Sequence, residues 1–348
     1  MSVVSILKSV ALYGGGIIAA IALGVFAWLL WPINVDESKD DPAVLVANEI
    51  ALGDVFYEEG YVGPQGARTH YVTAGQGDAI IFMHGFPSYW FSMFPLMEAF
   101  KNDHQVIAID GLGVGRSDAP ADVDAYKLEQ LVGSIEHVVE RFDLERVHLV
   151  GHDWGVAIVT AYAQAHPEKV NTVTTMAALP HNVLLTRLEQ DDEHREVFAY
   201  TSYFASANPV LLKALGVKRQ VWDSTYAPLL EKGLLSDAQA AQMQKDMGNP
   251  KRLDRLINWY RANLVDFDEI SATDYWPSKS TRLTAPSIFI YGEEDVVVTD
   301  ALMDDFQAIS DDLRVIALPD VAHRPHYEAR ERVIAEISAL LSEASETE

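Results

Sequence analysis

Three ionisable side chains occupy positions from which they can act together on one carbon–oxygen bond. Asp153 is the centre of Gly-His-Asp-Trp-Gly at residues 151–155, Asp295 ends Gly-Glu-Glu-Asp at residues 292–295, and His323 follows Val-Ala. Small residues on both sides of a nucleophile allow a sharp turn that holds one strained side chain at the top of a sheet. A carboxylate cannot usefully open an amide, but it can displace at an sp3 carbon and form an ester. The motif therefore predicts a nucleophilic Asp153.

The order of nucleophile, acid and histidine along the chain predicts a catalytic triad. His323 is the expected base and Asp295 its carboxylate partner. Glu293 and Glu294 are neighbouring acids, but the G-x-x-D spacing favours Asp295. His326 is a less favoured alternative base.

These side chains need a scaffold that brings the ends of distant segments together. Short Val/Ile-rich runs alternate with helical stretches, which is typical of parallel strands buried on both faces. The carboxyl ends of such strands meet at one edge of a doubly wound sheet, where binding sites lie. The expected strands are residues 79–83, 105–109, 146–150, 173–176, 287–291 and 313–318, and the expected helices are 88–100, 126–142, 154–165, 300–309 and 328–341.

A different pattern interrupts the alternation. Residues 181–283 are helical and rich in aromatic residues, without a convincing strand. We expect them to form a helical cap inserted between the two parts of the α/β core, residues 51–180 and 284–348.

The loop after the first expected strand predicts an oxyanion hole. It reads His84-Gly85-Phe86-Pro87. The backbone N–H of such a loop and that of the residue after the nucleophile stabilise an oxyanion. The expected donors are Phe86 and Trp154.

Taken together, these motifs resemble the epoxide hydrolases of the α/β-hydrolase fold, of the soluble epoxide hydrolase type, which are related to haloalkane dehalogenases. The resemblance covers about residues 54–341. It is carried by residues 84–87, Asp110 with Gly-Arg-Ser-Asp at 115–118, residues 151–155 and 292–295, and Ala322-His323 with Glu328. Ala322 departs from the glycine that usually precedes the catalytic histidine.

Two tyrosines of the cap separate epoxide opening from dehalogenation. The opened epoxide leaves an alkoxide, which needs a general acid, and a phenol is suitable. The resemblance implies this role for Tyr260, in Asn-Trp-Tyr-Arg, and for Tyr203, with Tyr200 one helical turn away as a substitute. It also implies that His84, Trp154, Tyr203 and Tyr260 contact the substrate.

The resemblance implies conversion of a neutral, largely apolar epoxide and water to a vicinal diol, through an ester on Asp153, with no metal and no cofactor. The glycine-rich segment at residues 111–116 is not a dinucleotide loop, because Arg116 replaces the last required glycine.

Two other functions remain open. One is a haloalkane or haloacid dehalogenase with the same nucleophile, and the other is a non-catalytic ligand-binding module tethered to a membrane.

The N-terminal part predicts a membrane anchor. Residues 9–31 contain no charge, and at about 1.5 Å per residue they can span a hydrocarbon core of about 30 Å. Trp28 and Trp31 suit an aromatic belt and disfavour a cleaved signal peptide, which needs small residues there. Residues 1–8 would flank the anchor, and residues 32–50 read as an acidic, solvated linker.

The charges around this segment weakly place the catalytic domain on the non-cytoplasmic side. Lys8 and the amino terminus precede the expected span, against Lys39 after it, and positive charge favours the cytoplasmic side. Gly16, Ala20 and Gly24 form a small-xxx-small face that suggests a homodimer.

Composition excludes several other classes. The 26 Lys and Arg stand against 51 Asp and Glu, for a net charge of −25, which opposes nucleic-acid binding and disfavours anionic substrates. The chain has no cysteine, so a disulfide framework, a thiolate metal site and a cysteine nucleophile are all excluded.

Overall fold

The computed structural model describes residues 23–24, 27–28, 30–51, 53–206, 219, 222–223, 225–246, 250–264 and 267–346. Its centre is an eight-stranded sheet with the order β1-β2-β4-β3-β5-β6-β7-β8. Strands β3 to β8 pair in parallel, whereas β2 runs antiparallel to both β1 and β4. The strands are β1 (Glu58–Val62), β2 (Thr69–Ala74), β3 (Ala79–Met83), β4 (Gln105–Ile109), β5 (Val147–His152), β6 (Val170–Met176), β7 (Ser287–Gly292) and β8 (Leu313–Leu318).

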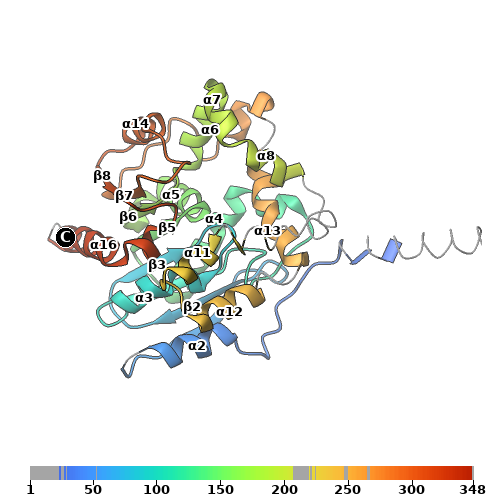
Figure 1. Cartoon of the computed structure of the whole chain (residues 1–348), viewed down its shortest axis with the longest axis vertical. Helices are drawn as coiled ribbons and strands as arrows, with labels where there is room; N and C mark the ends of the chain where they lie inside the picture. The colour runs from blue at the N-terminus through green and yellow to red at the C-terminus, as the bar shows by residue number, and fades with distance from the viewer. Residues whose placement is uncertain are drawn as a thin grey trace, which may run out of the picture.

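Helices cover both faces of the sheet (Figure 1). Helices α4 (Leu128–Phe142) and α5 (Trp154–Ala165) pack against each other on one face. Helices α3 (Phe94–Phe100) and α16 (Arg330–Ser345) pack against each other on the other face. All five residues of β3 are buried between these layers, which explains why the central strands read as continuous apolar runs.

The described residues between β6 and β7 form only α-helices and 3-10 turns, which lie over the carboxyl edge of the sheet (Figure 1). These short elements match the expected helical cap. They are α6 (His181–Gln190), α7 (Asp192–Val197), α8 (Ala199–Ser206), α11 (Ala227–Glu231), α12 (Asp237–Asp246), α13 (Pro250–Asn263) and the turns η4 (Phe267–Glu269) and η5 (Ala272–Asp274).

The remaining elements connect strands and helices of the core. They are α2 (Pro42–Ile50), η1 (Trp90–Met93), η2 (Val123–Tyr126), η3 (Pro167–Lys169), α14 (Asp300–Ile309) and α15 (Pro325–Glu328). The predicted strands and helices of the core are present, with ends that differ by a few residues. The antiparallel β1 and β2 were missed, because neither contains a continuous apolar run.

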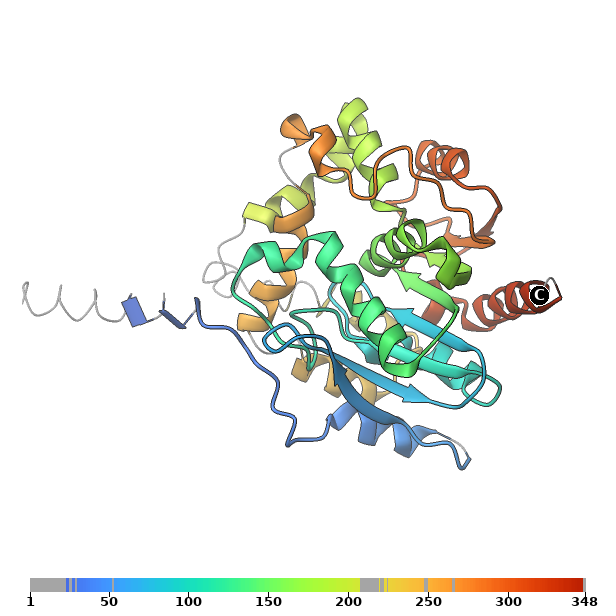
Figure 2. The same ribbon diagram turned by 180° about the vertical axis from the view of Figure 1, so that it is seen from behind.

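The prediction of a solvated linker at residues 32–50 is wrong. Ile33 forms a β-bridge with Ala119, and α2 packs against the cap helix α12. Asp41 caps α2 and, at 3% exposure, accepts a hydrogen bond of 2.8 Å from the indole N–H of Trp90. Both views show α2 across the sheet from α5 (Figure 1, Figure 2). The sequence prediction failed because the acidic composition includes the N-cap residue of α2, Asp41, and because the apolar face of α2 is short.

The predicted anchor at residues 9–31 lies mostly outside the described residues. No helix among the residues that the structure describes is long and apolar enough to cross a bilayer.

Candidate active site

The carboxyl ends of three parallel strands bring the predicted triad together. Asp153 follows β5, Asp295 follows β7, and His323 lies in the loop after β8. Asp153 sits in the sharp turn between β5 and α5 with φ 52° and ψ −124°. This conformation is costly for a residue with a side chain, and strain of this kind concentrates at functional sites. The turn projects the carboxylate from the edge of the sheet toward the cap.

Glycine on either side makes this turn sterically feasible. A Cβ atom at Gly155 would collide with the carbonyl oxygen of Met83, and one at Gly151 would press on the backbone of Gly155. The close approach of α5 to β3 therefore requires Gly155, and its approach to β5 requires Gly151. The sequence pattern around Asp153 thus has a direct packing cause.

His323 bridges the two carboxylates. Its Nδ1 lies 2.8 Å from Asp295 Oδ2, and its Nε2 lies 3.5 Å from Asp153 Oδ2. The other oxygen of Asp295 accepts the backbone N–H of Val297 at 3.2 Å. With Nδ1–H donating to Asp295, Nε2 is directed at the nucleophile and at the space where a water molecule would attack.

The electrostatics of this group depend on charge pairing. Burial alone would raise the pKa of Asp153, but the hydrogen bond and positive charge of His323 outweigh it, and the pKa is lowered. Burial alone would lower the pKa of His323, but its bonds to Asp153 and Asp295 raise it to about 9. The free site therefore holds a nucleophile that is already ionised beside a histidine that favours its charged form.

The expected oxyanion hole also forms. The backbone N–H of Phe86 donates to Asp153 Oδ1 at 2.6 Å, and the backbone N–H of Trp154 donates to the same carboxylate. The Phe86 amide therefore holds Oδ1, while Oδ2 faces His323. This asymmetry leaves Oδ2 as the oxygen that can attack.

Tyr260 of α13 contributes a buried phenol to the site. It is 4% exposed, and its ring packs edge-on against both Trp154 and Phe86 at centroid distances of 5.1 Å. Burial and the charge of Asp153 raise its pKa well above the ordinary value for tyrosine. Tyr260 therefore keeps its proton at neutral pH.

The second tyrosine of the site is Tyr200 rather than Tyr203. Tyr203 is 51% exposed and is not part of the cavity wall. Tyr200 is 40% exposed as a whole residue, yet it lines the cavity. Burial and the charges of Asp153 and Asp295 raise the pKa of its phenol. Three residues along a helix rotate a side chain by about 60°, and only the packing of α8 decides which tyrosine faces inward.

The cavity between core and cap has a mostly apolar lining with a few polar groups, which is typical of small-molecule sites. Asp153 lies in its wall together with Tyr200 and Tyr260. The other lining residues are Trp154, Ala157, Ala178, Leu179, His181, Leu184, Phe198, Thr201, Leu264 and Val297.

Comparison with known proteins places this arrangement in a family. The family model for the alpha/beta hydrolase fold matches residues 78–329. The chain belongs to the α/β-hydrolase fold family.

Named relatives of this α/β hydrolase include epoxide hydrolases. Epoxide hydrolase 3 of Xenopus tropicalis is 26% identical over 279 residues, which cover 76% of this chain and 73% of the relative. Epoxide hydrolase 4 of Mus musculus is 28% identical over 288 residues, which cover 77% and 75%. An epoxide hydrolase of Bacillus megaterium, solved with an inhibitor, superposes with a TM-score of 0.71 at 23% identity, covering 81% of this chain and 100% of that one. At that identity, the structural likeness shows the fold alone.

His84 of this α/β hydrolase does not contact the cavity, contrary to the sequence prediction. Its fully buried ring accepts the backbone N–H of Gly111 on Nε2 at 3.0 Å, and its Nδ1 lies 2.9 Å from the carbonyl oxygen of Gly85. The ring also stacks on Trp259 at 5.7 Å. His84 therefore links the loop at residues 84–87 to the loop after β4, on the side away from the cavity.

Sequence reasoning missed the support behind the catalytic histidine. His152, next to the nucleophile, bonds through Nε2 to the backbone carbonyl of His323 at 2.7 Å. His326 is fully buried, and its ring lies 4.4 Å from that of His152. His326 thus lies behind His323, and it is His323 that reaches Asp153. The position of His152 beside Asp153 was the only signal in the sequence for its role.

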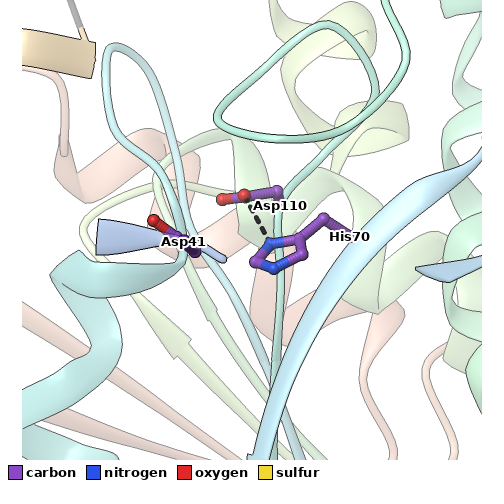
Figure 3. A group of neighbouring side chains, drawn as sticks. All are labelled: Asp41, His70 and Asp110. Atoms are coloured by element: carbon purple, nitrogen blue, oxygen red, sulfur yellow. Dashed lines mark hydrogen bonds and ion pairs between the residues drawn. The ribbon is translucent and has the colours of Figure 1, made fainter. Parts of the chain in front are cut away.

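A second group of ionisable side chains lies away from the cavity. The ligand atoms of Asp41, His70 and Asp110 all lie within 4.8 Å of one another (Figure 3). His70 contacts Asp110 through Nδ1 at 2.9 Å and Glu59 through Nε2 at 2.7 Å. Burial would lower the pKa of His70, but these two carboxylates raise it to about 9.

With a proton on each nitrogen, His70 has no free lone pair for a metal ion. The carboxylates are occupied as well, since Asp110 accepts the backbone N–H of Trp90 and of Arg116. The group is therefore a hydrogen-bond network that joins α2 to the sheet.

Proposed function

We propose that this α/β hydrolase converts a neutral, largely apolar epoxide to a vicinal diol. The observation that carries the proposal is the pairing of a carboxylate nucleophile, Asp153, with two protonated phenols, Tyr200 and Tyr260, in the wall of one apolar cavity. The named relatives support it.

In the first step, Asp153 Oδ2 attacks one carbon of the epoxide ring, and the carbon–oxygen bond of that ring breaks. A phenol, Tyr260 or Tyr200, donates its proton to the departing oxygen. The products are a hydroxyalkyl ester on Asp153 and a tyrosinate. The high pKa that burial imposes on both tyrosines keeps the proton available until negative charge develops on the substrate.

In the second step, His323 removes a proton from water, and the resulting hydroxide attacks the carbonyl carbon of the ester. The N–H of Phe86 already donates to Oδ1, and that of Trp154 donates to the same carboxylate, so both lie where they can stabilise the oxyanion that forms on Oδ1. Collapse breaks the ester bond, and the departing alkoxide takes the proton from His323. The new carboxyl proton returns to the tyrosinate, and the sum is epoxide plus water to diol.

The sequence left two other functions open. A dehalogenase of this fold would use the same Asp153, but a halide leaves without a proton, so two phenols beside the nucleophile favour the epoxide. A binding module would not need Asp295 and His323 at hydrogen-bonding distance.

Trapping the ester tests the proposal. His323→Gln removes the base for the second step and leaves the nucleophile in place, so addition of an aryl epoxide should increase the mass of the Asp153 peptide by the mass of the epoxide. Asp153→Ala in the same background is the control and should remain unmodified. An unmodified His323→Gln peptide, under conditions in which the native protein forms diol, would contradict the scheme.

We also propose that residues 9–31 anchor the protein in a membrane, with the catalytic domain on the non-cytoplasmic side. The support is the uncharged run and the lysines on either side of it. The full chain should stay in the membrane fraction during alkaline carbonate extraction, and Ala20→Arg should weaken this retention. Complete extraction of the unaltered chain would contradict the anchor.

We further propose that the face formed by Gly16, Ala20 and Gly24 pairs two such anchors into a homodimer. Cross-linking of the full chain in membranes should give a dimer that Gly16→Leu reduces. Cross-linking that Gly16→Leu leaves unchanged would contradict this role of the face.

A further inference from the structure

The apolar cavity contains a polar side chain that the proposed reaction does not use. His181 is the first residue of α6, lines the cavity and is 4% exposed. Its ring lies 6.5 Å from the Trp154 indole, centroid to centroid. His181 therefore borders the part of the cavity next to the Trp154 indole.

His181 has unused hydrogen-bonding capacity. It makes no hydrogen bond to any residue in the described part of the chain. Thr201, also in the cavity wall, donates its hydroxyl to the carbonyl oxygen of Phe198 at 2.7 Å. His194, another buried histidine of the cap, lies 2.9 Å from Asp191 and 2.7 Å from Thr299. His181 is not among the fully enclosed polar side chains that lack a partner, so its ring nitrogens stay open to a polar group that enters the cavity beside them.

The chemistry of that partner follows from the state of the imidazole. Burial lowers the pKa of His181 to about 4, although the charge of Asp274 opposes this. The neutral ring offers one N–H donor and one nitrogen acceptor. It can satisfy a hydroxyl, an ether or a carbonyl group, whereas a carboxylate would remain an uncompensated charge in an apolar wall.

His181 also stands where this cavity meets polar surface. It also borders a second cavity, whose lining includes Lys127, Glu129 and Asp274. A substrate arm that extends past Trp154 therefore passes from apolar to polar surroundings at His181.

We propose that His181 is a polar subsite that binds a neutral oxygen function, a hydroxyl group above all, on the arm of the epoxide that points away from the ring. This inference rests on the proposed epoxide hydrolase function and adds a class of substrate to it. His181 would act on specificity and take no part in proton transfer.

The test compares terminal epoxyalkanes with their ω-hydroxy counterparts, matched in chain length over a series. At the length that reaches His181, the native protein should prefer the hydroxylated substrate by about tenfold in kcat/KM. His181→Leu should bring this ratio to about one. His181→Gln should keep most of the preference, because a carboxamide both donates and accepts.

A neighbouring apolar position supplies the matched control. Leu184→Met, on the same helix and in the same cavity wall, changes shape with little change in volume and should leave the ratio unaltered. Thermal unfolding of each variant checks that the fold is retained. If His181→Leu does not fold, the native ratio and the Gln variant still decide the matter.

Several outcomes separate this inference from the proposed function. An unchanged ratio in His181→Leu, or no preference by the native protein at any chain length, overturns the subsite and leaves the function intact. Absence of diol from every epoxide in both series refutes the proposed function itself.

Discussion

The core edge and the cap position their catalytic side chains by different means. Asp153, Asp295 and His323 follow the parallel strands β5, β7 and β8 of one sheet, in which β6 joins β5 to β7, so backbone hydrogen bonds fix where each side chain emerges. The tyrosines lie on cap helices, where side-chain packing determines the rotation of each helix. Position along the chain therefore specifies the triad, and packing selects the tyrosines.

Removal of the nucleophile should give the largest effect. Asp153→Ala deletes the atom that attacks the epoxide, and we expect kcat/KM to fall by about 10⁴-fold or more. Diol formation, measured by chromatography, reports the loss. A residual activity within tenfold of the native protein would mean that the core edge does not carry the chemistry.

The cap should respond according to which tyrosine faces the cavity. Tyr260→Phe and Tyr200→Phe each remove a proton donor at the leaving oxygen, so kcat/KM should fall by about 10²-fold. Tyr203→Phe changes an exposed residue of the same helix and is the matched control, with an expected change below about threefold. A larger effect at Tyr203 than at Tyr200 would reverse the structural assignment.

Substitution of one glycine in the core edge and one in the cap compares how tightly the two regions are packed. Gly155→Ala places a methyl group against the Met83 carbonyl beneath the nucleophile and should destabilise the fold by about 3 kcal/mol. Gly233→Ala in the cap has φ +70° but nothing within 4 Å, so its cost should be about 1 kcal/mol, from the backbone alone. Urea unfolding measures both values, and equal values would contradict the tighter packing of the core edge.

The pH dependence should give the smallest effect. In the free site, the Asp153 carboxylate helps to raise the pKa of His323 to about 9. Esterification removes that charge, so the pKa of His323 falls in the intermediate. Because the base must be neutral, decay of the ester should rise with pH through an apparent pKa below about 9. Single-turnover measurements follow this decay, and an inflection above 9 would contradict the role of Asp153 in the shift.

Much of the α/β core was accessible from the sequence. The spacing around Asp153 predicted the turn because only glycine fits at Gly155, and the apolar runs predicted the central strands because they are buried on both faces. The family prediction is confirmed by the match over residues 78–329.

Other features depended on contacts between distant segments. Residues 32–50 looked like a linker, since composition does not reveal that Asp41 accepts a hydrogen bond from the indole of Trp90 in the core. His84 stands beside Gly85 in a catalytic motif, yet the structure turns it toward Gly111.

The sequence by itself predicted that Asp153, Asp295 and His323 lie at one edge of the sheet, because in a parallel sheet the position of a residue just after a strand already defines where its side chain emerges. Only the tertiary structure decided that Tyr200 rather than Tyr203 lines the cavity beside Asp153, and that His181 lies in the same cavity wall. A short cap helix rotates about its axis until its side chains pack, and no local pattern encodes that angle.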